Sequence, residues 1–402
     1  MNQNYDVAII GAGLAGSFAA LRLSRQYKNL KIIVLDSGRP PAKRRRQLEG
    51  WLGALPNSDG KFYETDTLRV AQICGNKKAK SAATWCRNYI GNIIDFNLIK
   101  DKNILVTAQK RLSHNSFEYQ LNNYYQLYPK EIHLLSKQLA TDLEDPSIKF
   151  SFDNEVFRIH KQKTSFVLTT QEGDFHAKNI LISVGRSGWR WATEQFSRFG
   201  IIDHNDTATF GIHAELPTTY MKDFRRSNCT IMKEGLQIGP VSWNGTVIPE
   251  DHVDLAISAF RSNENRWKTD KVSFQIIGSR RFEGSGVEQN ARLGKLAFLL
   301  SNDRVSRERV QTIMTKKSKI SVIQEFDWLV DTCREIDLII PNFINKGYFY
   351  VPMILPLAPK VKLEDDFTTE MNNLSVAGES AGIVGLMGAV VSGVVAADGI
   401  FK

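Results

Sequence analysis

The start of the chain alternates between short apolar runs and a helical apolar period. Residues 5–10 and 31–35 are apolar and rich in β-branched side chains, which predicts two short buried strands. Residues 14–25, which lie between them, carry apolar side chains at helical spacing and predict a helix. The pattern therefore predicts a strand–helix–strand unit at the beginning of the chain.

A glycine-rich turn joins the first of these strands to the helix. Gly11, Gly13 and Gly16 follow the spacing G-x-G-x-x-G, and the second strand ends on Asp36. In a dinucleotide-binding unit the first glycine makes the tight turn, the second admits a pyrophosphate, and the third lets helix and strand pack closely. The helix start offers free N–H groups to phosphates, and the acid can bind a ribose diol. The unit therefore predicts a dinucleotide site, with a purely structural glycine turn as the alternative.

The remainder of the chain repeats the same two patterns. Helices are expected at residues 128–143, 189–199, 287–300, 305–315, 322–335 and 383–400. Strands are expected at residues 148–152, 155–160, 165–170, 176–184, 254–260, 272–277 and 373–377. The strands between 155 and 184 predict an antiparallel meander that returns into a buried strand. Residues 215–337, with two strands and then mostly helix, fit an inserted domain, whereas residues 68–123 are polar and irregular.

Composition places the chain among ordinary folded proteins. Its 402 residues suffice for about two to three domains or for one elaborated domain. The hydrophobic fraction of 42% and the charged fraction of 24% are usual for a folded soluble protein. Four cysteines without C-x-x-C spacing indicate reduced thiols in a cytoplasmic protein, with neither a disulfide framework nor a zinc site. The net charge of +9 suits a soluble enzyme, and it also suits a phosphate, carboxylate or nucleic-acid partner.

Two long apolar stretches could be mistaken for membrane segments. Residues 7–21 lack a basic flank and follow Asp6, unlike a signal peptide. Residues 381–397 are uncharged, but they are rich in glycine and alanine and slightly short for a span. We therefore expect both stretches to be buried in the fold and expect no membrane span.

Several charged side chains are candidates for binding or catalysis. A basic run that includes Arg44 and Arg45 suits the phosphates of a cofactor, with a solvated loop as the alternative. Asp59 and Lys61 lie in a segment of turn composition, where the acid could act as a base and the lysine could stabilise negative charge. Arg186 could hold an anionic group of a substrate or form a salt bridge on the meander.

The histidines give no indication of a metal site. None of the seven histidines has the spacing of metal ligands. His213 and His252 are isolated in the sequence, so structural roles are expected for both. We therefore expect no metal.

Three separated segments together resemble the FAD-binding half of the glutathione-reductase-type flavoprotein superfamily. They are residues 11–16 (GAGLAG) with Asp36, residues 180–185 (ILISVG) after the meander, and residues 374–382 (LSVAGESAG) before the last helix. Within that superfamily the chain is most similar to a poorly characterised group of FAD-dependent dehydrogenases, and more distantly to geranylgeranyl-reductase-like enzymes. Residues 58–61, 185–188 and 378–382 carry this finer resemblance, and residues 68–123 and 218–337 lie largely outside it.

The resemblance implies an α/β fold with a Rossmann-like FAD-binding domain, a three-stranded β-meander and an inserted α+β substrate domain. The FAD-binding domain would comprise residues 1–67, 126–214 and 341–402. An irregular insertion at 68–125 and a substrate or cap domain at 215–340 would interrupt it.

The resemblance also implies which residues hold FAD. The glycine loop would bind the pyrophosphate, Asp36 the adenosine ribose, Glu379 the ribityl chain or a phosphate, and a helix starting at Gly382 would face the N1/C2 edge of the flavin. Backbone at Val156 would lie against the adenine, and Gly185 would let the chain pass close to the cofactor. The full set of expected cofactor-binding residues is Gly11, Gly13, Leu14, Ala15, Gly16, Asp36, Ser37, Arg44, Arg45, Val156, Gly185, Gly378, Glu379, Gly382 and Ile383.

Three functions are compatible with a flavin site in this chain. The first is an FAD-dependent dehydrogenase or reductase acting on a small or amphipathic organic substrate held between the FAD domain and the inserted domain, and an anionic substrate is one of the alternatives. The second is an FAD-dependent monooxygenase that uses NADPH and oxygen, and NAD(P)H is also open as a transient donor for the first. The third is a non-enzymatic or RNA-associated flavoprotein. Neither a second G-x-G-x-x-G nor a C-x-x-x-x-C pair occurs, which argues against a built-in NAD(P)H domain and against thiol relay chemistry.

Overall fold

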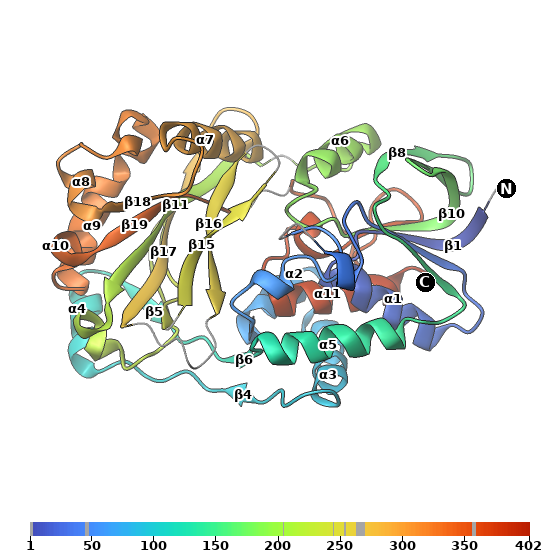
Figure 1. Cartoon of the computed structure of the whole chain (residues 1–402), viewed down its shortest axis with the longest axis horizontal. Helices are drawn as coiled ribbons and strands as arrows, with labels where there is room; N and C mark the ends of the chain where they lie inside the picture. The colour runs from blue at the N-terminus through green and yellow to red at the C-terminus, as the bar shows by residue number, and fades with distance from the viewer. Residues whose placement is uncertain are drawn as a thin grey trace. The chain divides into compact units, whose positions relative to one another are not determined.

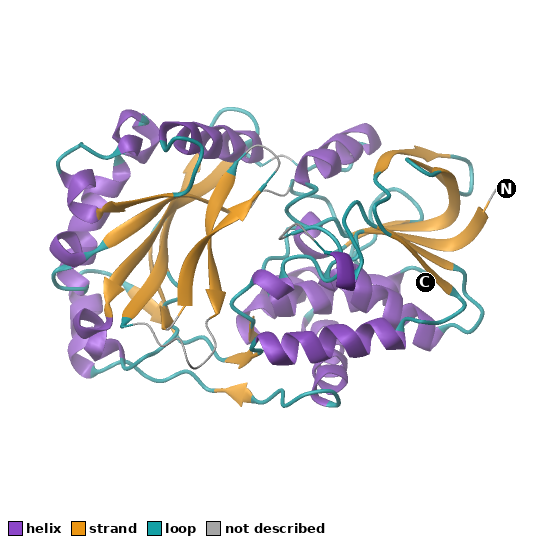
Figure 2. Cartoon of the chain, viewed as in Figure 1, coloured by secondary structure: helices purple, strands orange, loops and turns teal. Residues whose placement is uncertain are grey.

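The computed structural model describes residues 3–44, 48–203, 205–243, 245–252, 255–262, 270–355 and 359–402. The chain divides into two compact units, each assembled from separated segments (Figures 1 and 2). Unit 1 comprises residues 1–97, 125–204 and 358–402, and unit 2 comprises residues 98–124 and 205–357. Residues 341–357, which we expected in the FAD-binding domain, therefore lie in unit 2.

Unit 1 is built on a mixed sheet in which the described residues form seven strands, in the order β7-β2-β1-β10-β9-β8 with β20 also paired to β10. Strands β7, β2, β1, β10 and β20 are parallel, whereas β8 and β9 form the expected antiparallel meander into β10. Their bounds are β1 (Gln3–Ile10), β2 (Ile32–Leu35), β7 (Ile148–Ser151), β8 (Val156–Lys161), β9 (Phe166–Thr170), β10 (Gly173–Ile182) and β20 (Leu374–Val376), with the short strands β3 (Lys61–Tyr63) and β6 (Tyr124–Gln126) elsewhere.

The register of the parallel strands aligns their carboxyl ends. Ile10 of β1 lies opposite Leu35 of β2 and Ile182 of β10. Ile182 in turn lies opposite Val376 of β20. The loops that follow these strands therefore meet at one edge of the sheet, where open parallel sheets bind their ligands.

Helices cover this sheet and bury one another. They are α1 (Leu14–Gln26), α2 (Thr67–Cys74), α3 (Asn76–Gly91), α5 (Pro129–Asp142), α6 (Trp189–Phe199) and α11 (Leu386–Gly399). Helix α11 packs along α1 and α3 and is buried on nearly all sides, as an apolar helix without a polar face must be (Figure 1). Among the described helices, none combines the length and the apolar character that a bilayer crossing needs.

The sequence analysis was wrong about residues 68–125, which are not irregular. They contain α2 and α3, and also α4 (Val106–His114) in unit 2. The side chains that α3 buries are mostly small, among them Ala79, Ala82, Ala83 and Cys86, in a segment otherwise rich in lysine. Small buried side chains among charges give a weak apolar period, so the helical pattern was not recognised.

The last helix starts three residues later than expected, at Leu386. The preceding residues form a short 3₁₀ turn, η8 (Gly378–Ala381), followed by Gly382 at φ +71° and Gly385 at φ +93°. Left-handed φ values interrupt a right-handed helix. Gly382 is therefore not the start of α11.

Unit 2 is built on an antiparallel sheet for which the described residues supply eight strands, in the order β18-β19-β11-β17-β13-β12-β5 with β14 on β17. A separate hairpin pairs β15 with β16. The strands are β4 (Leu98–Ile99), β5 (Glu118–Gln120), β11 (Thr207–Pro217), β12 (Thr230–Lys233), β13 (Leu236–Ile238), β14 (Ser242–Trp243), β15 (Gly245–Asp251), β16 (Ala256–Ser262), β17 (Lys271–Arg281), β18 (Ser306–Arg309) and β19 (Tyr348–Leu355).

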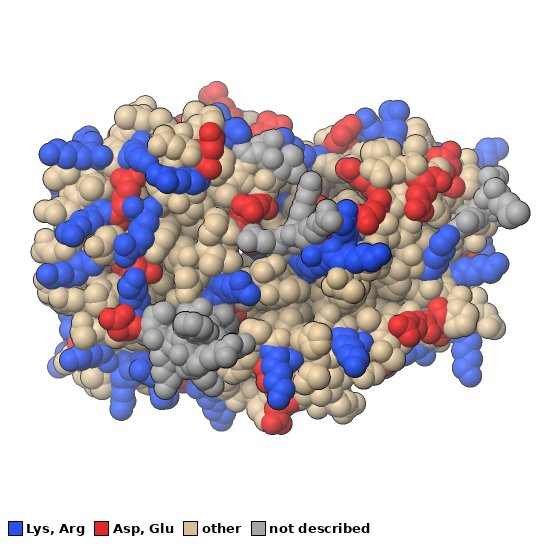
Figure 3. Space-filling model, in the orientation of Figure 1, with Lys and Arg blue, Asp and Glu red and all other residues tan. Residues whose placement is uncertain are grey.

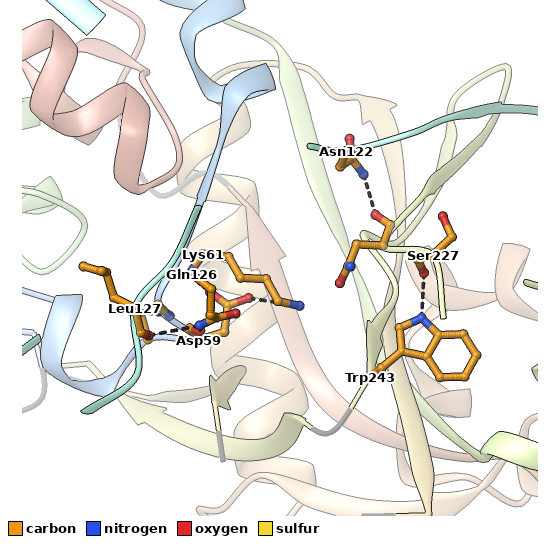
Figure 4. Close-up of polar contacts among 10 residues, drawn as sticks. Asp59, Lys61, Asn122, Gln126, Leu127, Ser227 and Trp243 are labelled. Atoms are coloured by element: carbon orange, nitrogen blue, oxygen red, sulfur yellow. Dashed lines mark hydrogen bonds and ion pairs between the residues drawn. The ribbon is translucent and has the colours of Figure 1, made fainter. Parts of the chain in front are cut away.

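The core of unit 2 lies between this sheet and the helices α4, α7 (Gly286–Leu300), α8 (Val310–Met314), α9 (Trp328–Ile339) and α10 (Phe343–Lys346). Alternate side chains of β11, among them Phe210, Ile212 and Ala214, enter that core. Hydrogen bonds from Trp243 Nε1 to the Ser227 carbonyl (2.6 Å) and from Asn122 Nδ2 to the Asn228 carbonyl (2.6 Å) tie the loops at the sheet (Figure 4).

Unit 2 contains more sheet than the sequence analysis predicted. The expected helix at 305–315 begins as β18 and becomes helical only at Val310. The expected helix at 322–335 is displaced to α9, after two 3₁₀ turns. Strand β19 was not predicted, because both its faces are mainly apolar or aromatic and show no alternation.

Candidate functional site

The glycine loop after β1 is fitted closely to the strand beside it. Gly11 has φ +105°, and a Cβ atom there would lie 2.5 Å from the carbonyl oxygen of Ser183. A Cβ atom at Gly16 would lie 2.0 Å from the carbonyl oxygen of Gly11. Real Cβ atoms do not approach oxygen so closely, so both positions require glycine for the reasons expected from the motif.

Gly13 has different surroundings and faces open space. It is the N-cap residue of α1, and no described atom lies within 4 Å of the position that its Cβ atom would take. No side chain caps the helix and no acidic residue lies in its first turn. Within the described chain the amides of Leu14, Ala15 and Gly16 have no hydrogen-bond acceptor. An uncapped helix N-terminus beside open space can bind an anion.

Asp36 organises the loops around this helix start. Its Oδ2 accepts a hydrogen bond from the amide of Ala12 (2.6 Å), and its Oδ1 accepts from the amides of Gly38 (2.7 Å) and Gly50 (2.9 Å). Burial raises the pKa of Asp36 above its ordinary value, although the three amides act in the opposite direction. A carboxylate can accept about four hydrogen bonds, so one acceptor position remains for a ligand hydroxyl. Ser37, the next residue, is exposed.

Arg44 acts on the same loops through backbone carbonyls. Its guanidinium donates from Nη1 to the Trp51 carbonyl (2.5 Å) and from Nη2 to the Gly53 carbonyl. Burial lowers the pKa of Arg44 to about 10, and the nearby Asp36 carboxylate partly offsets this. The amide of Leu52 donates to the Ala12 carbonyl (2.8 Å), so the segment that Arg44 holds lies against the glycine loop. Arg45 lies outside the described residues.

Val156 begins β8 close to Asp36. The amides of Asp153 and Asn154 donate to the carbonyls of Gly38 (2.8 Å) and Asp36 (3.0 Å), and Val156 follows two residues later with a buried side chain. The structure therefore brings Asp36 and Val156 to the same side of the helix start.

The loops after β10 and β20 lie on the opposite side of β1. Gly185 (φ +62°) and Gly382 (φ +71°) both face open space, whereas a Cβ atom at Gly378 would lie 3.0 Å from Ala15 Cβ. Ile383 is buried, and its amide donates to the Gly378 carbonyl (3.1 Å), which closes the turn. Ile383 is thus a structural residue of this turn.

Arg186 and Glu379 bridge these two loops. Arg186 Nε donates to Glu379 Oε2 at 3.0 Å, and Nη2 lies 2.9 Å from Oε1. The two groups form an ion pair that neutralises both charges, and its hydrogen bond is accepted by Oε2, since Oε1 has no hydrogen-bond partner in the described chain. The salt bridge expected for Arg186 thus exists, but its partner lies after β20 and not on the meander.

Asp59, in the loop before β3, pairs with Lys61, the buried first residue of that strand. The Asp59 Oδ1 accepts from the amide of Lys61 (3.1 Å), and Oδ2 lies 4.0 Å from Lys61 Nζ. Burial raises the pKa of Asp59, and Lys61 partly offsets this. Gln126 Nε2 donates to the Asp59 carbonyl (2.9 Å) and to the Leu127 carbonyl (3.0 Å), which fixes the loop (Figure 4).

Asp66 was not predicted from the sequence, and its carboxyl group occupies the N-terminus of α11. Its Oδ2 accepts from the amide of Met387 (3.3 Å), and a Cβ atom at Gly385 would lie 2.2 Å from the carboxyl group. Burial raises the pKa of Asp66 well above its ordinary value, and Asp59 acts in the same direction. A glycine at the residue before a long apolar helix was the only signal in the sequence, and it does not identify the partner.

The two histidines singled out in the sequence have structural partners in unit 2. Ser258 Oγ donates to the Pro352 carbonyl (3.0 Å), so the 2.7 Å contact of His213 Nδ1 with Ser258 Oγ places the ring proton on Nδ1. Burial lowers the pKa of His213 to about 3, so the ring is neutral. His252 Nε2 lies 3.2 Å from Glu250 Oε1. In the described parts of the chain, no three His, Cys, Asp or Glu side chains gather to hold a metal.

Charge on the surface is mixed in sign. On the face drawn in Figure 3, Lys and Arg side chains lie among Asp and Glu side chains. Lys78, on the lysine-rich helix α3, is paired with Asp365.

No family model matches the chain, and no curated protein matches it. Among solved structures, glycine oxidase from Geobacillus kaustophilus is 14% identical, with 99% of this chain and 94% of that chain covered and a TM-score of 0.44. L-α-glycerophosphate oxidase from Mycoplasma pneumoniae, a structure with FAD bound, is 12% identical over 98% of this chain and 94% of that chain, with a TM-score of 0.44. The p-nitrophenol 4-monooxygenase PnpA from Pseudomonas putida DLL-E4 is 11% identical over 99% of this chain and 78% of that chain, with a TM-score of 0.45. At such identities and TM-scores, cofactor and reaction have to be argued from the residues of this chain.

Proposed function

We propose that the chain is an FAD-dependent oxidoreductase, a dehydrogenase or reductase that acts on an organic substrate. The observation that carries this proposal is the open N-terminus of α1 at Gly13. It lies at the carboxyl edge of a parallel sheet, it is uncapped, and space is free where a side chain would be. These are the properties that a pyrophosphate site requires.

The surroundings of Gly13 favour a dinucleotide over a single nucleotide, because there is room for a ligand on both sides of it. On the β2 side, Asp36 keeps one acceptor position for a ribose hydroxyl, and Val156 lies nearby. On the β10 and β20 side, Gly185 and Gly382 leave space beside the loops. We therefore propose that the adenosine part lies toward Asp36 and the flavin part toward Gly185 and Gly382.

FAD, when bound, would supply two-electron chemistry through its flavin ring. The chain would supply binding and electrostatics. Lys61 is a buried cation that can stabilise negative charge, and the Asp59 carboxyl can hold a proton beside it. The Arg186 guanidinium is already neutralised by Glu379, so we propose that it fixes the two loops and does not bind an anionic substrate.

Gly13→Val tests the carrying observation. Because no described atom lies within 4 Å of the Cβ position, a valine at the N-cap would enter the space proposed for the pyrophosphate, and we expect loss of FAD with little loss of stability. Flavin content per chain, from the visible absorption of the purified protein, is the measurement, with urea unfolding in parallel. Gly91→Val is the matched control, because Gly91 ends α3 and also faces open space. Equal FAD content in Gly13→Val and the parent protein would refute the proposed site.

The reaction class has its own test. A dehydrogenase or reductase should show anaerobic bleaching of the flavin by its organic donor, without oxygen uptake. Oxygen uptake that depends on NADPH would instead identify a monooxygenase and contradict this part of the proposal.

A further inference from the structure

The N-terminus of α11 is occupied by a carboxyl group of the chain itself. Helix N-termini attract negative charge because their amides are unpaired and the helix dipole is positive there. At α11 this position is taken by Asp66, whose Oδ2 accepts from the Met387 amide at 3.3 Å. The absence of side chains at Gly385 and Gly388 makes room for it, since a Cβ at Gly385 would lie 2.2 Å from the carboxyl group and one at Gly388 would lie 3.0 Å from the Asp66 carbonyl oxygen.

Few charges compensate this carboxyl group. The first turn of α11, Leu386 to Ala389, contributes no ionisable side chain. Asp59 lies close enough to oppose ionisation of Asp66, and Lys61 is paired with Asp59. Glu64 adds a further acid on the same 3₁₀ turn as Asp66, η3 (Glu64–Asp66), and Arg69 on α2 is exposed and bonded to Gln72. Burial raises the pKa of Asp66 well above its ordinary value, so this carboxyl group takes up a proton more readily than an exposed aspartate does.

The turn that leads into α11 is the same turn that we assign to the flavin end of the site. Residues 378–382 follow β20 at the carboxyl edge, Gly382 faces open space, and three residues later Gly385 contacts Asp66. Negative charge that enters this end of the site upon reduction would act on the partly buried Asp66, where solvent screens a charge less than in bulk water.

We propose that Asp66 is a positioning residue that couples reduction of the bound flavin to the uptake of one proton, held on the Asp66 carboxyl group at the N-terminus of α11. The electrons come from the reductant, an organic hydride donor or dithionite, and the proton comes from solvent. The reverse holds on reoxidation, when the carboxyl group returns the proton. This inference rests on the proposed function, because it requires FAD in the site.

The test is the pH dependence of the flavin reduction potential in the purified holoprotein and in Asp66→Asn. Asparagine keeps the shape and an acceptor for the Met387 amide but cannot take up a proton. Over the pH range in which Asp66 ionises, the parent protein should bind one more proton per two electrons than Asp66→Asn, so its potential should fall more steeply with pH. Asp174→Asn, an exposed acid on β10, is the matched control and should follow the parent protein.

The outcomes separate the two proposals. Parallel pH profiles for the parent protein and Asp66→Asn, with FAD retained by both, overturn the proton coupling and leave the FAD site intact. A parent protein that takes up no FAD on reconstitution overturns both. Should Asp66→Asn fail to fold, Asp66→Ser offers a hydroxyl cap to α11 without a titratable group, and the same loss of one proton is expected for it.

Discussion

Asp36 and Asp66 both accept hydrogen bonds from backbone amides, but their surroundings favour different protonation states. Asp36 accepts three amide hydrogen bonds at 2.6–2.9 Å and joins three loops around the start of α1. Asp66 accepts from the amide of Met387 at 3.3 Å and from the amide of Tyr63, at a site with another acid nearby. Hydrogen bonds from amides stabilise the ionised form of a carboxyl group. The carboxylate of Asp36 is therefore the better stabilised of the two, and Asp66 binds a proton more readily.

The stability of the protein should therefore respond to pH through Asp66. The pKa of Asp66 is raised in the folded chain, so between its ordinary value of 3.8 and the raised value the native state holds a proton that the unfolded chain has released. Stability from this group is present below pH 3.8 and is lost as pH rises through the folded pKa, at about 1.4 kcal/mol per pH unit. Asp66→Asn should lack this loss.

Urea unfolding from pH 4 to pH 8 measures the difference. Asp66→Asn should gain stability relative to the parent protein as pH rises, while Asp174→Asn should not. A constant difference between Asp66→Asn and the parent protein at all pH values would show that folding does not raise the pKa of Asp66.

Residues of the site were predictable where local sequence fixes their role. Gly11, Gly13 and Gly16 were identified because a short motif between a strand and a helix specifies them, and the structure gives each the expected surroundings. Asp66 was missed because its partner, Met387, lies 321 positions away. Such a pairing depends on how α11 packs, and neither local propensity nor periodicity carries that information.

At the scale of elements, prediction and structure agree best for helices and strands with a strong hydrophobic period in the sequence. Helix α6 has the predicted bounds, and α5 and the meander strands differ from prediction by a few residues at most. Helix α3 and strand β19 were not predicted from the sequence, for opposite reasons. The first buries small side chains within a charged segment, and the second is apolar on both faces, so neither shows a clear period.

The contact between α11 and α1 can be tested at Gly393. A Cβ atom at this position would lie 2.2 Å from the carbonyl oxygen of Ala15, which is backbone and cannot turn aside. Gly393→Ala should therefore separate the two helices and lower the free energy of unfolding by about 1–3 kcal/mol, although alanine favours helix. Because Ala15 belongs to the first turn of α1, FAD should also bind more weakly.

Thermal unfolding and FAD titration of Gly393→Ala provide the measurements. Gly91→Ala, at the end of α3 with no described atom within 4 Å of its Cβ position, is the control and should change stability little. An undiminished melting temperature in Gly393→Ala would mean that the two helices do not pack as closely as the structure has them.

At the scale of the whole molecule, three aspartates of unit 1 and one histidine of unit 2 respond to acid in opposite directions. The side chains of Asp36, Asp59 and Asp66 in unit 1 are partly buried and their pKa values are raised, so protonation of these three groups favours the folded form. Unit 2 buries His213 as a neutral ring, whose pKa is lowered to about 3. Protonation of that histidine favours the unfolded chain.

His213 should make unit 2 lose stability on acidification. Between pH 6.5 and pH 3 the unfolded chain binds a proton at this residue that the native state does not, so stability is lost as pH falls through 6.5. From pH 6.5 to pH 4.5 the loss is at most about 3 kcal/mol. His213→Gln keeps an N–H group for Ser258 and cannot be charged, so its unit 2 should be less stable at pH 7 but less sensitive to acid.

Hydrogen exchange of peptides from β11 and α9, compared at pH-corrected rates, measures the stability of unit 2 alone, with the exposed His114→Gln as control. Equal acid sensitivity in His213→Gln and the parent protein would place the acid-labile group elsewhere in the chain.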